Sequence, residues 1–135
     1  MDGSNPTGIT ADSRGANGIA IDFESRELYW AEYYDNRIRS SNLEGGAVVK
    51  TAQTTGPYGI AVAGQRIYWG GLNSGVVESK SKSGKETPIQ VASDADSNVF
   101  MAPNWIPPKS RRNDCEQQNC RGLCVLSRTS YTCVE

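Results

Sequence analysis

The chain has 135 residues, with 14 lysines and arginines against 15 aspartates and glutamates, and it contains no histidine. The balanced charge, without long runs of one sign, argues against nucleic-acid binding. The lack of histidine excludes catalysis by a histidine base and a zinc site with histidine ligands. We therefore expect no catalytic activity and no cofactor.

A repeat of about forty residues dominates the sequence. The pattern Gly-Ile-Ala-Ile-Asp at 18–22, followed by Leu-Tyr-Trp at 28–30, returns as Gly-Ile-Ala-Val at 59–62 and Ile-Tyr-Trp at 67–69. The period suits a propeller blade of four short strands. We expect a partial unit at 1–16, whole units at 17–56 and 57–96, and a final strand at 97–104.

Within each unit, two strands are predicted from local patterns. The first alternates β-branched with small residues, and the second carries large side chains on both faces. Both faces of such a strand must be covered, which radial stacking of sheets achieves. The expected core residues of the repeat are Ile19, Ile21, Tyr29, Trp30, Ile60, Val62, Tyr68 and Trp69.

Between the second and third strands of the first unit lies an aromatic and charged loop. Such loops are where propellers present surfaces for protein partners, although an ordinary exposed hairpin explains each residue alone. The candidate contact residues are Glu32, Tyr33, Tyr34, Asp35 and Arg37. In the second unit, Lys80, Lys82 and Lys85 are interpreted as a solvated strand edge that opposes mispairing.

The C-terminal part begins with a proline-rich connector at 105–112 and holds all four cysteines, Cys115, Cys120, Cys124 and Cys133. Clustered cysteines favour disulfides in an oxidising compartment, and their spacing fits paired zinc ligands poorly. The basic residues before Cys115 also make a calcium site unfavourable. Spacing alone leaves three disulfide connectivities open.

No apolar stretch is long enough to span a membrane, and residues 1–16 lack the pattern of a signal peptide. A disulfide-rich segment without a secretion signal is most simply an internal piece of a longer extracellular protein. We expect a two-repeat piece to be marginally stable alone, because its terminal sheets leave apolar faces open.

The Gly-Ile-Ala-Ile-Asp, Leu-Tyr-Trp and Leu-Glu-Gly patterns resemble the YWTD propeller repeat of the low-density lipoprotein receptor-related family. The resemblance implies an all-β fold: a partial YWTD (LDL-receptor class B) β-propeller at 1–104 and a truncated, disulfide-bonded EGF-like module at 113–135. It also implies the pairs Cys115–Cys124 and Cys120–Cys133. The Thr-Asp half of the motif is Ala31-Glu32 in the first unit and Gly70-Gly71 in the second.

The function that this resemblance implies is non-catalytic binding or scaffolding in the extracellular part of an endocytic or signalling receptor. Its partners would be protein ligands or neighbouring receptor modules, with no nucleic acid and no membrane span within the chain. The alternative is the matrix-assembly propeller of a nidogen-like basement-membrane protein. A propeller enzyme is the remote alternative, for which no convergent carboxylates are evident.

Overall fold

The computed structural model describes residues 4–72, 74–93, 123–126 and 131–134. Strands and turns make up these residues, so none of them forms a helix that could cross a membrane. The strands are β1 (Ala16–Asp22), β2 (Glu27–Glu32), β3 (Arg37–Asn42), β4 (Val49–Gln53), β5 (Pro57–Ala63), β6 (Arg66–Gly71), β7 (Val77–Ser81), β8 (Ile89–Ala92), β9 (Leu123–Leu126) and β10 (Tyr131–Val134).

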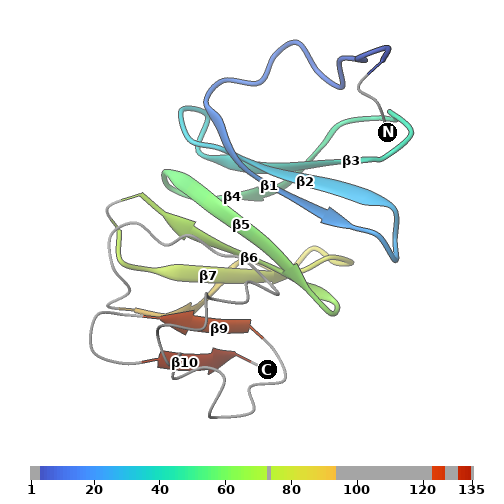
Figure 1. Ribbon diagram of the computed structural model, residues 1–135. Helices are drawn as coiled ribbons and strands as arrows, with labels where there is room; N and C mark the ends of the chain where they lie inside the picture. The colour runs from blue at the N-terminus through green and yellow to red at the C-terminus, as the bar shows by residue number, and fades with distance from the viewer. Residues whose placement is uncertain (1–3, 73, 94–122, 127–130, 135) are drawn as a thin grey trace, which may run out of the picture.

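Two four-stranded antiparallel sheets follow one another along the chain, as Figure 1 shows. The first sheet has the order β1-β2-β3-β4 and the second has the order β5-β6-β7-β8, so every connection within a sheet is a hairpin, and the β4–β5 connection leads from one sheet to the other. The hairpin between the second and third strands needs a left-handed residue in both sheets, Asn36 in the first and Gly75 in the second. The predicted all-β fold is confirmed by these two sheets.

The sheets pack face to face, with β1 beside β5 (Figure 1). A Cβ atom on Gly18 would overlap the backbone carbonyl of Tyr58, so the two innermost strands approach too closely for any other residue. This contact explains why β1 has glycine at position 18.

The buried core consists of two clusters, one between the two sheets and one on the other face of the second sheet. Tyr29 of the first sheet packs in one cluster with Ile60, Ile67 and Trp69 of the second. The opposite face of the second sheet holds a second cluster, in which Tyr68 packs with Val77. The expectation that the second strand buries large side chains on both faces is confirmed for these residues.

Two predicted core residues are exposed instead. Ile19 is 67% and Ile21 44% exposed, whereas their counterparts are buried (Ile60, 3%) or partly buried (Val62). The reason is position: among the described residues, the second sheet has the first sheet against this face, and the first sheet has no sheet there. The repeat pattern identifies the face correctly but does not show which copies of it are covered.

The lysines at the end of the second unit are also not all on a solvated edge. Lys80 is buried and donates to the carbonyl oxygen of Gly84 at 2.6 Å. The Lys82 ammonium reaches the other sheet and lies 2.5 Å from Asp22, with both side chains less than 10% exposed. Lys82 is therefore an inter-sheet ion-pair partner.

The cysteine-rich part is described only as the hairpin of β9 and β10, in which Cys124 lies directly opposite Cys133. Cys115, Cys120, the final strand at 97–104 and the connector at 105–112 lie outside the described residues. The two disulfides, the EGF-like module and the boundaries of the parts therefore stay predictions.

Candidate protein-contact surface

The predicted contact loop is the turn from β2 to β3, residues 33–36, which we call the tyrosine loop. Tyr33 and Tyr34 stack edge to face, with ring centroids 5.3 Å apart and an interplanar angle of 79°. Tyr34 is 71% exposed and Tyr33 is half-buried. Aromatic rings that are partly exposed to solvent supply contact area at a low cost in conformational entropy, which is why tyrosine is common at interfaces.

The loop is held in shape by the strand connection that leads into the second sheet. Asn36 accepts a hydrogen bond from the backbone N–H of Gly56 at 2.8 Å through its side chain. Its carbonyl oxygen accepts another from the backbone N–H of Thr54 at 3.0 Å. These bonds fix the tyrosines before any partner arrives, so less conformational entropy is lost on binding.

Glu32 does not belong to this surface, contrary to the prediction. Its side chain is fully buried and accepts hydrogen bonds from Trp30 Nε1 at 2.8 Å and Arg37 Nε at 2.5 Å. Arg39 Nη1 adds a third contact at 3.3 Å. Burial raises the pKa of Glu32, but hydrogen bonds from its neighbours, Arg37 and Trp30 among them, outweigh it and lower the pKa. Glu32 is therefore an internal anion.

Asp35 and Arg37 are also largely engaged within the molecule. Arg37 bridges Glu32 and Asp35, and Arg14 meets Asp35 at 2.7 Å. Arg39, which also contacts Glu32, forms an ion pair with Asp12 at 2.8 Å. This alternating chain of charges begins and ends on the N-terminal segment, and it ties that segment to the first sheet. Of the five predicted contact residues, only Tyr34 is widely exposed.

A cavity of about 470 Å³ lies beside the tyrosine loop. Its other walls come from the strand connection at 54–56 and from the β6–β7 turn of the second sheet, so two neighbouring sheets build it together. The lining residues are Tyr33, Tyr34, Asn36, Thr55, Gly56, Leu72 and Ser74. None of them is charged, which suits an uncharged side chain of a partner.

Sequence reasoning missed the part of this cavity that the second sheet supplies. Leu72 and Ser74 belong to a turn whose counterpart in the first unit is the tyrosine loop itself. Because neighbouring blades repeat the same order of strands, their equivalent turns must lie at the same end of the sheets. The equivalence of these two turns in the repeat was the signal from which Leu72 and Ser74 could have been predicted.

In the described residues, no three Cys, Asp or Glu side chains come together as a metal site would require. The acidic side chains near the loop form ion pairs with arginines. Asp12, for example, has a pKa lowered to about 2 by hydrogen bonds from Thr10 and Arg39. The candidate surface is therefore bordered by ion pairs within the molecule.

No family model matches the chain. Human low-density lipoprotein receptor-related protein 5 is 30% identical, over 98% of this chain and 8% of the receptor. The Drosophila melanogaster vitellogenin receptor Yl is 27% identical, over 94% of this chain and 7% of that protein. The vitellogenin receptor of Solenopsis invicta is also 27% identical, over 99% of this chain and 8% of the receptor.

Among solved structures, a chain in the crystal structure of the nidogen/laminin complex aligns with a TM-score of 0.59 and 25% identity, covering 69% of this chain and 38% of that one. The chain thus spans under a tenth of the receptors that it matches.

Proposed function

Since this chain shares the sequence pattern and the propeller fold of the low-density lipoprotein receptor-related family, we propose that it is an extracellular binding and scaffolding segment of such a receptor, either endocytic or signalling. Its relatives are receptors, which supports a non-catalytic role and an extracellular position. Function follows from sites more than from folds, so the tyrosine loop is the part that the proposal must explain.

The observation that carries the proposal is the preformed aromatic surface where two sheets meet. Tyr34 projects into solvent while hydrogen bonds through Asn36 hold the backbone beneath it. Beside it, an uncharged cavity is walled partly by Leu72 of the next sheet. Exposed tyrosine next to a concave, uncharged pocket is the composition that protein interfaces favour at their centres.

Site-specific photo-crosslinking tests the proposal. A photoreactive phenylalanine derivative replaces Tyr34 in one variant and Phe23 in the other, in the full-length receptor that contains this chain. Phe23 is a matched control because it is an exposed aromatic residue, 80% accessible, in the β1–β2 turn, at the other end of β2 from the tyrosine loop. We expect Tyr34 to capture defined extracellular proteins and Phe23 not to do so. Equal yields from the two positions would contradict the proposal.

The matrix-assembly alternative has one observation in its favour, the structural similarity to a chain of the nidogen/laminin complex. Cell fractionation separates the two readings, because a receptor segment is labelled by surface biotinylation and recovered in detergent. A matrix segment would remain in the detergent-insoluble extracellular material.

A further inference from the structure

The alternating chain of charges has an open cationic end on the N-terminal segment, residues 4–15. Its inner arginines, Arg37 and Arg39, each contact two carboxylates. Among the described residues, Arg14 contacts only one, because its Nε and Nη2 both donate to Oδ1 of Asp35, at 3.1 and 2.7 Å. The Arg14 side chain is 76% exposed. A guanidinium carries five N–H donors, so Arg14 has donors left for a second carboxylate.

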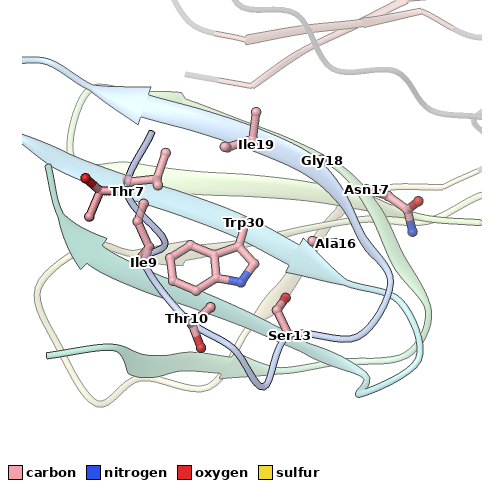
Figure 2. A pocket seen from close by; sticks show the side chains of 10 residues that line it. Thr7, Ile9, Thr10, Ser13, Ala16, Asn17, Gly18, Ile19 and Trp30 are labelled. Carbon is pink, nitrogen blue, oxygen red and sulfur yellow. The ribbon is translucent and has the colours of Figure 1, made fainter. Parts of the chain in front are cut away.

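The N-terminal segment holds Arg14 beside the tyrosine loop. Ser13 of this segment lines a cavity together with Trp30 of the first sheet, as Figure 2 shows. At the end of the segment, the carbonyl oxygen of Gly15 accepts a hydrogen bond from the backbone N–H of Tyr33 at 2.9 Å. The backbone on both sides of Arg14 is therefore fixed to the first sheet.

Tyr34 connects this cation to the uncharged cavity at the junction of the two sheets. A Cβ atom on Gly15 would overlap Cδ2 of Tyr34, so the ring rests directly on the residue that follows Arg14. The same ring lines the cavity of about 470 Å³, together with Leu72. One exposed tyrosine thus borders both a cation and an uncharged pocket.

We propose that the tyrosine loop recognises an acidic peptide segment, in which an aspartate or glutamate pairs with Arg14 and a neighbouring apolar side chain enters the cavity. This inference rests on the proposed function and adds the chemistry of the partner.

Charge complementarity determines the sign of the partner's charge. The carboxylates nearest to Arg14 along the chain of charges are Asp35 and Glu32, whose side chains are 10% and 0% exposed and already paired with arginines. In the described part of this surface, a basic partner would meet the exposed guanidinium and no exposed carboxylate. An acidic partner meets an accessible cation there.

The two halves of the proposed contact have different roles. An exposed ion pair is screened by salt and contributes little affinity, so the apolar side chain in the cavity must supply most of it. The carboxylate selects among partners and speeds their association, as charges at the rim of an interface do.

Selection from a random heptapeptide library displayed on phage tests this inference. The library is bound to the immobilised full-length receptor that contains this chain, and in parallel to its Tyr34→Ala variant. Peptides that bind the wild type but not Tyr34→Ala report on the tyrosine loop. We expect these peptides to be enriched in aspartate or glutamate next to an aliphatic residue, relative to the starting library.

Variants of the receptor then test the ion pair itself. Arg14→Gln should weaken the binding of the selected peptides at least about threefold in fluorescence polarisation at low salt, and the loss should shrink at high salt. Arg14→Lys should restore most of the binding. Arg26→Gln is the matched control and should leave it unchanged, because Arg26 is 66% exposed and contacts a single carboxylate, that of Glu44, in the β1–β2 turn at the other end of β2.

Replacing the acid of each peptide by its amide completes the comparison. The amide peptide should bind the wild type as weakly as the acidic peptide binds Arg14→Gln, and Arg14→Gln should weaken it no further. Tyr34-dependent peptides without an excess of acids, or equal binding of acidic peptides to Arg14→Gln and the wild type, would overturn this inference and leave the proposed function standing. A selection that yields no Tyr34-dependent peptide would overturn both.

Discussion

The interactions of the Asp22 carboxylate with Lys82 and Ser25 should together contribute about 2 kcal/mol to the free energy of unfolding at neutral pH. Burial raises the pKa of Asp22, but the ammonium of Lys82 and hydrogen bonds from Ser25 outweigh it and bring the pKa from 3.8 to about 2. One pKa unit corresponds to about 1.4 kcal/mol, which gives the magnitude. Both side chains are less than 10% exposed, so solvent screens the pair little.

The sign of the pH dependence follows from the direction of the shift. Folding lowers the pKa of Asp22, so the stabilisation is complete above the unfolded-state value of about 4. It is lost as the pH falls through that value toward the folded-state pKa of about 2. Urea denaturation followed by tryptophan fluorescence, from neutral pH down to this range, measures the loss.

Substitution isolates the pair. Lys82→Met leaves the Asp22 carboxylate buried without a counterion and should cost about 3 kcal/mol, more than the pair itself contributes. Asp22→Asn keeps the acceptor for the backbone N–H of Glu24, and the double variant should cost less than the sum of the single changes. Glu44→Gln is the matched control, because the Arg26–Glu44 pair is 66% and 56% exposed, so that solvent screens it and its loss should change the free energy of unfolding little. Additive single effects would refute the coupling.

Four further predictions concern other parts of the chain. The pKa of Tyr29 is raised by burial and by Glu27, so the stability that the phenol contributes below about pH 10 should be lost as the pH rises further. Ultraviolet titration of the phenol measures this pKa. A phenol that ionises at the usual tyrosine pKa would contradict the prediction. Glu78→Ala removes an acceptor 3.0 Å from the indole nitrogen of Trp69 and should lower the free energy of unfolding by about 1 to 3 kcal/mol in urea titrations. Gly15→Ala places a side chain at φ +65° and against the ring of Tyr34, so it should destabilise by about 1 kcal/mol and reduce crosslinking from position 34. The chain expressed by itself should be marginally stable or aggregate; a cooperative thermal melt of a monodisperse monomer would show otherwise.

The sequence predicts the elements of this fold well because the repeat appears twice. Gly18 and Gly59, with the Tyr-Trp pairs that follow them, determine the strand order and the face that each residue occupies. What a single sequence does not contain is the environment of each copy. Ile19 and Ile60 have the same pattern around them, yet one is exposed and the other buried, because burial depends on which sheet lies alongside.

The candidate surface was only partly predictable for a related reason. Charged residues in a turn indicate exposure on average, but Glu32 lies at the end of β2, where Arg37 and Trp30 converge on it from within the same sheet. Likewise, Lys82 pairs with a residue sixty positions earlier, a separation at which local patterns carry no information. Leu72 joins the cavity only through the packing of two sheets.

The two tryptophans of the repeat show how the same bond survives a change in sequence. Trp30 donates its indole N–H to Glu32, two residues along its own strand, whereas Trp69 donates to Glu78, its cross-strand neighbour on β7. The second unit has glycine where the first has Glu32, and the first has Arg39 where the second has Glu78.

Selection at this site can therefore act on the presence of a carboxylate within reach of the indole and leave its place in the chain unspecified. A search pattern that demands an acid two residues after the tryptophan would count one repeat in a chain that folds two. Repeats that exchange such positions can drift apart in sequence while their architecture stays constant.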